Sequence, residues 1–526
     1  MTIFCKAFRA YIVFGISLSF LPGIAFCQSN DDQKSTPKPP TPDTHANEKF
    51  PAPAAEEKSQ KTSHTIHAKG QELRYTAVAG TLILKKDEGN GQPAASVFFI
   101  AYTLDGADTN KRPLTFAFNG GPGSSSVWLH IGALGPKRVA LTDEGLAVPP
   151  PYRLVDNEQT ALTFTDLVFI DPVTTGFSRH APGEDPKQFH GVEEDLDSVA
   201  DVIRLYLTKY GRWNSPKFLA GESYGTTRAA GLSKLLLDRY GIYLNGITLI
   251  SSALDFRTLS FQPGNDLPNI LFLPSYATTA WFHKKLPADL ESRDVKDVAE
   301  EARTFAAGPY AQALMKGDKL AEPERRQIVE QLARFTGLGP DYIDRSDLRI
   351  SDERFFKELL RGQHELVGRY DSRLTNYALD PASEAAEFDP SYASVEGAFT
   401  AAFNDYVRKE LNWQTDLPYN ILTPKVWPWN MSGFTNGYVN TAYRLKDAMT
   451  ENQFMHVLQM NGYYDLATPF FATEYTFDHL NLAPALRGNV SMGYCGAGHM
   501  LYLKSSCREE LQSDMSRMYQ SVLSSR

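Results

Sequence analysis

Cysteine is scarce in this chain, which has four cysteines among 526 residues. The sequence contains no Cys-x-x-Cys pair and no His-Glu-x-x-His motif, two spacings that are typical of zinc sites. We therefore predict no structural or catalytic metal and no other cofactor. Cys5 and Cys27 fall in or beside an N-terminal targeting segment, which leaves Cys495 and Cys507 in the body of the chain. In an exported protein these two are expected to form a disulfide, although two free thiols remain the alternative.

Positive charge is not in excess either. The chain has 53 Lys and Arg residues against 62 Asp and Glu residues, a net charge of -9, and no basic stripe. Nucleic acid is therefore not an expected partner. No long hydrophobic run occurs beyond the N-terminus, so we expect no stable membrane span. The length indicates one large domain with insertions or two domains, and the oligomeric state is not predicted.

The first 27 residues have the features of a secretory signal peptide. Lys6 and Arg9 precede an almost wholly apolar stretch from Tyr11 to Phe26, and the small residue Ala25 lies third from the end of the segment. We therefore predict a signal peptide over residues 1–27, and export to the periplasm or to the outside of the cell.

Two other interpretations of this segment are weaker. A short membrane anchor is one, but the apolar stretch is marginal for a span and Pro22 interrupts it. A lipid-bearing Cys27, as in a bacterial lipoprotein, is the other, and the bulky Phe26 before it argues against that. A Pro-rich stretch follows, so residues 28–62 are predicted to be a disordered linker and residues 63–526 the folded part.

Strand-like and helix-like segments alternate through most of the folded part. The strand-like runs are LRYTAVAGTLILKK, ASVFFIAYTL, LTFAF, LVFI, KFLA, GITLIS and FMHVLQM. Helical spacing of apolar residues occurs between them, as at Leu196, Val199 and Ile203. The first two runs resemble an antiparallel meander. The alternation after them predicts an α/β fold with a mainly parallel sheet and helices on both faces.

One long region interrupts the alternation. Between about residues 263 and 403 we find charged helical segments and no convincing buried strand. Because strands resume afterwards, we interpret this region as a helical cap inserted into the α/β domain. A separate helical domain is the alternative.

The sequence Gly221-Glu222-Ser223-Tyr224-Gly225 matches the Gly-x-Ser-x-Gly nucleophile elbow. In such an elbow the serine lies on a sharp turn between a strand and a helix, and the glycines allow the chain to cross closely. Here an apolar strand precedes the motif and an amphipathic helix follows it. Ser223 is therefore the candidate nucleophile, with an ordinary glycine-rich turn as the alternative.

An acid and a histidine should follow the serine along the chain. Asp465 follows the strand FMHVLQM, and beyond it the sequence has two histidines, His479 and His499. His479 is in a helical-looking stretch, whereas His499 is in the glycine-rich loop after NVSMGY. Since catalytic groups gather at the carboxyl ends of strands in open α/β sheets, we predict Asp465 and His499 as the partners of Ser223.

An oxyanion hole should combine the N–H group after the nucleophile, that of Tyr224, with one from an earlier loop. The glycine loop FNGGPGSSS, residues 118–126, follows a strand and has the backbone freedom to approach a ligand.

The chain contains five motifs in this order: FNGGPGSSS, DPVTTGFS, GESYG, NGYYD and AGHM. With these motifs it resembles the serine carboxypeptidase family, as an exported, bacterial-type member. The resemblance implies the α/β-hydrolase fold and the removal of single residues from the C-termini of peptide substrates. It also implies roles for individual residues. The triad would be Ser223, Asp465 and His499, the oxyanion donors the N–H groups of Gly121 and Tyr224, and the carboxylate-binding groups Asn119, the Gly120 N–H and Glu222.

Three features depart from the family pattern. Ser124 replaces a cysteine, the DPVTTGFS segment is shorter than usual, and Ala133 replaces a glutamate. That glutamate would share a proton with Glu222, because like charges raise a pKa. Without it we expect weaker recognition of the substrate carboxylate, unless His130 binds the carboxylate as a cation.

We therefore predict a serine-type carboxypeptidase that works through an acyl-enzyme. An acyltransferase or esterase on the same scaffold is the alternative. A non-catalytic binding protein is a third interpretation, which the intact motifs disfavour.

Overall fold

The computed structural model describes residues 54–86 and 91–524, within one compact unit from Pro51 to Arg526. The predicted signal peptide and most of the predicted linker lie outside the described residues. Among the helices that are described, none is both long and apolar enough to cross a membrane.

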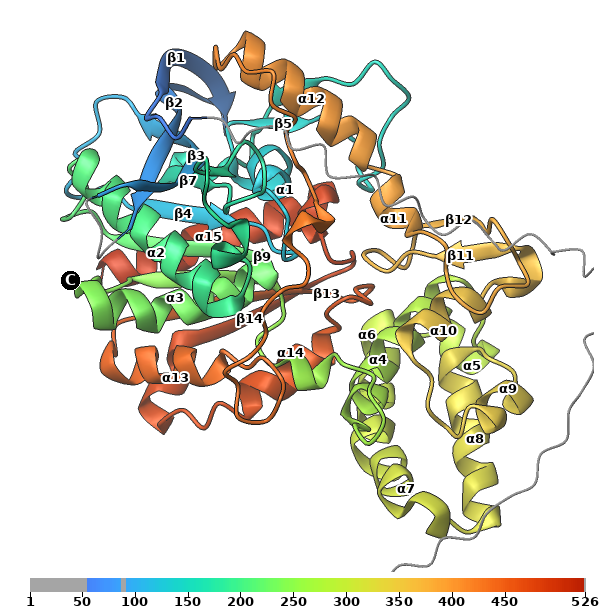
Figure 1. Cartoon of the computed structure of the whole chain (residues 1–526). Helices are drawn as coiled ribbons and strands as arrows, with labels where there is room; N and C mark the ends of the chain where they lie inside the picture. The colour runs from blue at the N-terminus through green and yellow to red at the C-terminus, as the bar shows by residue number, and fades with distance from the viewer. Residues whose placement is uncertain (1–53, 87–90, 525–526) are drawn as a thin grey trace, which may run out of the picture. The chain divides into compact units, whose positions relative to one another are not determined.

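A large sheet organises the described residues (Figure 1). Its ten strands run in the order β1-β2-β3-β7-β4-β9-β10-β13-β14, and β8 pairs with β3. The strands of this sheet are β1 Ser59–Ala68, β2 Gln71–Lys85, β3 Pro93–Leu104, β4 Leu114–Phe118, β7 Asp166–Ile170, β8 Arg179–His180, β9 Lys217–Ser223, β10 Gly246–Ser252, β13 His456–Gly462 and β14 Val490–Cys495. From β7 to β14 each neighbouring pair is parallel, and β1, β2 and β3 form the antiparallel meander.

Two small antiparallel pairs lie outside this sheet. They are β5 Lys137–Val139 with β6 Leu154–Asp156, and β11 Glu365–Val367 with β12 Thr375–Tyr377. The helices are α1 Val127–Leu129, α2 Val192–Lys209, α3 Tyr224–Tyr240, α4 Leu267–Phe282, α5 Ala288–Glu291, α6 Val295–Phe305, α7 Ala311–Lys316, α8 Glu322–Thr336, α9 Pro340–Arg345, α10 Asp352–Glu358, α11 Pro390–Ala393, α12 Glu396–Lys409, α13 Ala442–Glu451, α14 Phe470–Asp478 and α15 Ser505–Ser524.

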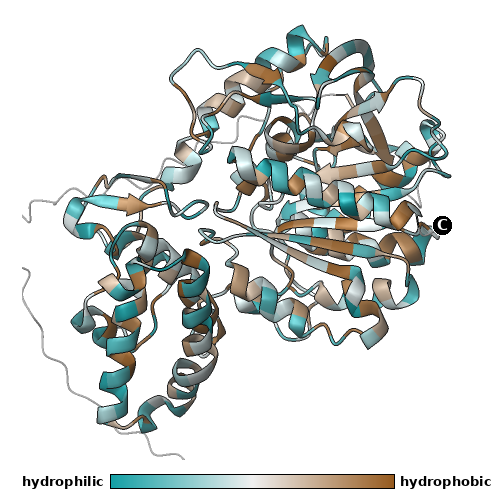
Figure 2. Cartoon of the chain, turned by 180° about the vertical axis from the view of Figure 1, so that it is seen from behind, coloured by the Kyte–Doolittle hydropathy of each residue, from teal (hydrophilic) through white to brown (hydrophobic). Residues whose placement is uncertain are grey.

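Each face of the sheet is covered by its own hydrophobic core. Helices α1, α12 and α15 cover one face, and α2, α3 and α13 cover the other. Strand β3 contributes to both cores because its side chains alternate, Phe98 and Ile100 to the first and Val97 and Phe99 to the second. Figure 2 shows hydrophobic residues concentrated in the strands and on the helix sides that face them. This arrangement confirms the predicted α/β fold.

The folded part begins earlier than predicted. Strand β1 starts at Ser59, so residues 59–62 of the predicted linker pair with β2, for example Thr62 with Ala77. Most side chains of β1 are exposed. Because the ladder of backbone hydrogen bonds defines this strand and little apolar burial accompanies it, its sequence carried no hydrophobic pattern to detect.

The inserted region lies between β10 and β13, which are direct neighbours in the sheet (Figure 1). It has a third hydrophobic core, formed mainly by side chains between Leu259 and Ala386. The predicted boundary at residue 403 falls inside α12, and α12 packs on the sheet core through Phe399 and Phe403. The insertion also contains the short hairpin β11–β12, which sequence analysis did not predict because each strand has only three residues.

Candidate active site

Ser223 lies at the turn between β9 and α3. Its backbone has φ 59° and ψ -131°, a conformation that residues other than glycine rarely adopt. A Cβ atom on Gly221 would lie 2.3 Å from the Gly225 carbonyl oxygen, and one on Gly225 would lie 2.6 Å from that of Phe118. The close crossing of strand and helix therefore requires both glycines, as in a nucleophile elbow.

The glycine loop after β4 touches this turn. A Cβ atom on Gly120 would lie 2.4 Å from the backbone nitrogen of Tyr224. Gly121 has φ 102°, in the region that favours glycine. The two N–H groups predicted to bind an oxyanion, those of Gly121 and Tyr224, thus belong to segments whose backbones are in contact.

A buried ion pair that was not predicted joins α3 to α2, and its arginine also bonds the glycine loop. Arg228 of α3 donates to Asp195 of α2 at 2.7 Å and to the Asn119 carbonyl at 2.7 Å. The two side chains are 1% and 2% exposed. Because arginine keeps its charge when buried, it needs these fixed acceptors, and it thereby holds the Asn119 peptide in place. In the sequence, this ion pair could have been predicted from the charged residues on the otherwise apolar faces of the two helices.

Asp465 and His499 follow the adjacent strands β13 and β14 and meet at their carboxyl ends. His499 Nδ1 lies 2.8 Å from Asp465 Oδ2. The carboxylate also accepts hydrogen bonds from the backbone of Ala467 at 2.8 Å and from the backbone and hydroxyl of Thr468 at 2.9 and 2.8 Å. These donors fix the carboxylate, which in turn orients the imidazole.

The charge of Asp465 decides the protonation of His499. Burial lowers the pKa of the imidazole, but the charge and hydrogen bond of Asp465 act against this effect, and the pKa of His499 is raised. The other ring nitrogen, Nε2, has no hydrogen-bond partner among the described residues and lies 3.6 Å from Glu222 Oε1. It is therefore available to act as a base toward the pocket.

Most of the predicted site residues line one pocket. Its lining includes Asn119, Gly120, Gly121, Glu222, Ser223 and His499, and its other walls are Ser124, Trp128, Tyr370, Tyr392, Leu422 and Met500. Asp465 lies behind His499, away from the pocket. His479 is remote from it, exposed at the end of α14, with Nδ1 2.7 Å from the Tyr475 carbonyl oxygen. In residues 54–86 and 91–524, no group of three or more His, Cys, Asp or Glu side chains is arranged to hold a metal ion.

Glu222 is buried between the glycine loop and the base. Its Oε2 accepts hydrogen bonds from Asn119 Nδ2 and, at 2.6 Å, from the Tyr502 hydroxyl. Burial raises the pKa of Glu222, and the nearby Asp465 adds to the increase. His499 and the two hydrogen-bond donors oppose it without cancelling it. Burial therefore favours the protonated form, which can donate a hydrogen bond to a carboxylate.

The surroundings of Ala133 correct one expectation. His130 does not line the pocket: it is 2% exposed, bonded to the Tyr102 hydroxyl at 2.6 Å, and burial lowers its pKa to about 3. The alternative that His130 binds a carboxylate as a cation is therefore wrong. From the side of Ala133, the group that contacts Glu222 is Tyr502, whose ring packs against Gly132 in the same turn as Ala133. Sequence analysis missed Tyr502 because it considered only a second acid or a cation as a partner for Glu222.

A second buried acid lies beneath the glycine loop. Asp171, the first residue of DPVTTGFS, accepts hydrogen bonds from the Ser126 backbone at 2.9 Å and the Tyr419 hydroxyl at 3.2 Å. Burial raises the pKa of Asp171 to about 7. Its other oxygen has no hydrogen-bond partner among the described residues.

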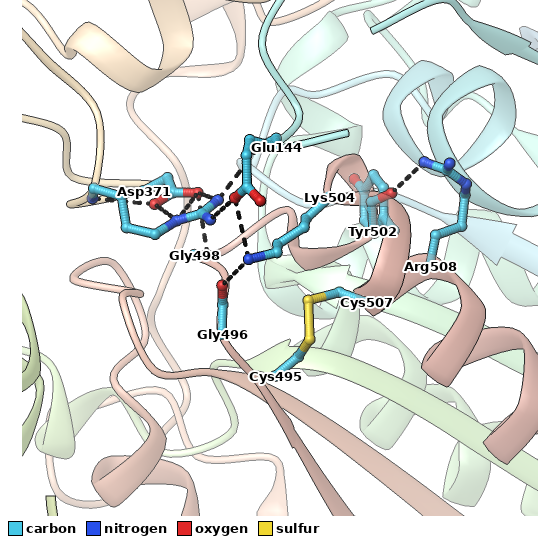
Figure 3. The surroundings of a disulfide bond; sticks show 10 residues. Glu144, Asp371, Cys495, Gly496, Gly498, Tyr502, Lys504, Cys507 and Arg508 are labelled. Atoms are coloured by element: carbon cyan, nitrogen blue, oxygen red, sulfur yellow. Dashed lines mark hydrogen bonds and ion pairs between the residues drawn. A yellow bond between two sulfur atoms is a disulfide. The ribbon is translucent and has the colours of Figure 1, made fainter. Parts of the chain in front are cut away.

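Cys495 and Cys507 form a disulfide, with Cα atoms 5.8 Å apart (Figure 3). The bond joins the end of β14 to the first turn of α15 and closes the segment that carries His499. Beside it, Lys504 Nζ lies 3.1 Å from Glu144 and 3.3 Å from the Gly496 carbonyl oxygen. His499, the predicted base, is therefore in a short loop whose two ends are covalently joined.

Comparison with known proteins identifies the family. The sequence model of the family described as serine carboxypeptidase matches residues 88–489. The pheromone-processing carboxypeptidase KEX1 of Saccharomyces cerevisiae is 30% identical over 156 residues, which are 28% of this chain and 20% of the yeast protein. Serine carboxypeptidase-like 33 of Arabidopsis thaliana is 27% identical over 153 residues, which are 28% of this chain and 30% of the plant protein. The matched segments thus span less than a third of either relative.

The fold is also similar to that of a solved structure. The crystal structure of KEX1(delta)p, a prohormone-processing carboxypeptidase from Saccharomyces cerevisiae, superimposes with a TM-score of 0.52 and 16% sequence identity, and covers 84% of this chain and 91% of that chain. The described residues therefore have the α/β-hydrolase fold of these enzymes.

Proposed function

The chain belongs to the serine carboxypeptidase family, and on that premise we propose that it releases C-terminal residues from peptides through an acyl-enzyme on Ser223. The observation that supports the proposal most directly is the shared pocket. The elbow serine, the glycine loop and His499 line one cavity, with Asp465 2.8 Å behind the histidine.

The proposed reaction is acyl transfer in two steps. His499 Nε2 takes the proton of Ser223 Oγ while Oγ attacks the carbonyl carbon of the last peptide bond. The N–H groups of Gly121 and Tyr224 stabilise the oxyanion that forms. His499 then gives the proton to the leaving amino group, and the C-terminal residue departs. Water repeats the sequence on the ester and releases the shortened peptide.

We further propose that Asn119, the Gly120 N–H and Glu222 bind the carboxylate of the departing residue. A neutral Glu222 donates to this carboxylate, whereas an ionised Glu222 would repel it. The raised pKa of Glu222 supports this role. The free carboxylate thus selects the last peptide bond over internal ones.

Substitution of the proposed nucleophile gives the first test. Ser223→Ala should abolish cleavage and fluorophosphonate labelling while the circular dichroism spectrum stays unchanged, because loss of a triad serine costs many powers of ten in rate. Activity of the variant within about tenfold of wild type would contradict the proposal. Digestion of a peptide library, with product masses read at the C-terminus, would distinguish a carboxypeptidase from an acyltransferase that leaves peptides intact.

Two histidine variants form a matched pair for the base. His499→Ala should lose activity by a comparable factor, and His479→Ala, on the exposed end of α14, should retain it. Loss of activity in the second variant alone would overturn the assignment.

We also propose that the protein is exported to the periplasm or the cell exterior. The N-terminal segment 1–27 motivates this, and the Cys495–Cys507 disulfide is compatible with an oxidising compartment. Cell fractionation, with N-terminal sequencing of the mature protein, tests it.

A further inference from the structure

The hairpin loop of the insertion, residues 369–373 between β11 and β12, contacts both the acid loop after β13 and the base loop after β14. Two hydrogen bonds join it to the acid loop: the Leu466 N–H donates to the Arg369 carbonyl at 3.1 Å, and the Ser372 N–H donates to the Tyr464 carbonyl at 3.0 Å. Two more join it to the base loop: the His499 N–H donates to the Tyr370 carbonyl, and the Gly498 N–H donates to the Asp371 carboxylate at 3.3 Å. The acid and base loops also bond directly, from the Tyr464 N–H to the Ala497 carbonyl at 3.0 Å. Four consecutive residues of the insertion, 369–372, therefore bridge the two loops that carry the proposed acid and base.

Tyr370 is the closest of these residues to the base. Its ring stacks on the His499 imidazole with centroids 5.1 Å apart and an interplanar angle of 27°. A Cβ atom on Gly498 would lie 2.2 Å from the Tyr370 carbonyl oxygen, so the backbones are in close contact. The stacked ring prevents the imidazole from tilting away from Asp465, and its face also favours a cation.

Arg373 anchors the hairpin loop and is not among the residues that line the pocket. Its side chain is 6% exposed and lies 2.7 Å from Asp371 and 2.9 Å from Glu144. Glu144 is 61% exposed, so its ion pair contributes little on its own. The bond to Asp371 matters more, because Asp371 accepts from the Gly498 N–H beside the base.

We propose that residues 369–373 act as a clamp that fixes the acid and base loops relative to each other, and that Tyr370 is a positioning residue for His499. The proposal rests on the proposed function of Ser223, Asp465 and His499. In this proposal the insertion has two roles: it forms a wall of the pocket, and it fixes the position of the proposed base.

The test compares Tyr370→Leu with a matched control, Tyr377→Leu, on the same hairpin, where the side chain is 71% exposed. The measurement is the rate constant for inactivation by a small fluorophosphonate, which needs Ser223 and His499 but no C-terminal carboxylate. We expect Tyr370→Leu to slow inactivation by about 10- to 100-fold, because small misplacements of reacting groups cost that much. Tyr370→Phe, which keeps the ring, should restore most of the rate, and Tyr377→Leu should match wild type.

The pH profile of inactivation separates positioning from simple loss of structure. The ionisable groups that influence the pKa of His499 are Asp465, Glu222 and Arg369, and all three stay in the variant. Loss of the ring removes support for the imidazolium, so the apparent pKa of the acidic limb should fall in Tyr370→Leu and return in Tyr370→Phe. An unchanged rate and an unchanged profile in Tyr370→Leu would overturn the proposal.

Arg373→Met tests the clamp away from the pocket, since Arg373 does not line it. We expect a decrease in kcat of about tenfold with little change in KM, and none in Arg517→Met, where the side chain is 74% exposed. Wild-type kcat in Arg373→Met would contradict the clamp. Failure of the fluorophosphonate to label wild-type Ser223 would instead contradict the proposed function, so the two failures are distinguishable.

Discussion

In its proposed role, Glu222 has to meet two requirements that conflict in water, because it must hold a proton and yet lie beside polar groups that favour its ionised form. Burial resolves the conflict by penalising the charge. The expected weakness of carboxylate recognition rested on the missing acid at Ala133. Since burial raises the pKa of Glu222 without that acid, we now expect recognition of the free carboxylate below the raised pKa and its loss above it.

This expectation predicts a pH-dependent preference for free acids. The ratio of kcat/KM for a peptide to that for its C-terminal amide should fall as the pH rises through the pKa of Glu222. In Glu222→Gln the donor is permanent, so the ratio should become independent of pH over that range. Tyr502→Phe removes a donor to the ionised form, raises the pKa of Glu222 and should move the fall upward by roughly one pH unit. Equal cleavage of acid and amide at every pH would support weak recognition.

Asp171 allows a stability prediction. Its pKa is about 7 in the folded protein and close to the ordinary 3.8 when the chain is unfolded, so the folded protein holds a proton that the unfolded chain releases. The free energy of unfolding should therefore decrease as the pH rises from about 4 to 7. Asp171→Asn cannot ionise, and between pH 5 and 7 wild type should lose roughly 2 kcal/mol more than this variant in urea unfolding.

The control for this measurement is Asp108→Asn, at a side chain that is 52% exposed. It should follow the wild-type curve. Parallel pH dependences of wild type and Asp171→Asn would show that Asp171 is ionised in the folded protein.

At the scale of elements, the disulfide is the feature whose removal is simplest to interpret. The double substitution of Cys495 and Cys507 by Ser opens a loop with a sequence separation of 12 and should lower the free energy of unfolding by about 3 kcal/mol. On warming, the activity of this variant should decrease more than that of wild type, because His499 lies inside this loop. Mass spectrometry after alkylation checks the premise: thiols found at both positions in the native, non-reduced protein would contradict it.

The elements that the sequence predicted are those whose signal is local. The apolar runs of β4, β7, β9 and β10 are buried on both faces, and the turn at Ser223 has its glycines in sequence, so both could be recognised from the residues alone. The elements that were missed depend on partners distant in the chain. Strand β1 is polar and defined by pairing, and the importance of Tyr370 follows only from its stacking on His499, 129 positions away in the sequence.

At the scale of the whole molecule, the separate core of the insertion predicts local unfolding that removes activity. Phe355 is fully buried in the insertion core and Phe116 in the sheet core. Phe355→Leu should loosen the insertion first, since a unit with its own core can open independently. On warming, we expect activity to disappear together with new protease cuts between residues 259 and 386, while the sheet stays intact.

Phe116→Leu is the matched variant for this comparison. It should lose activity and sheet structure together, with cuts on both sides of the insertion. Identical cleavage patterns in the two variants would show that the insertion and the sheet unfold as one unit.

The distribution of the proposed triad along the chain has a consequence for the time at which the enzyme becomes active. Ser223 is synthesised long before Asp465 and His499, and β13 and β14, which precede the proposed acid and base, are the last strands of the sheet in chain order. About 280 residues separate the serine from the histidine, so at roughly 5–20 residues per second a ribosome needs on the order of 15–55 s to add them. Throughout that interval a nascent chain has the proposed nucleophile without the proposed base.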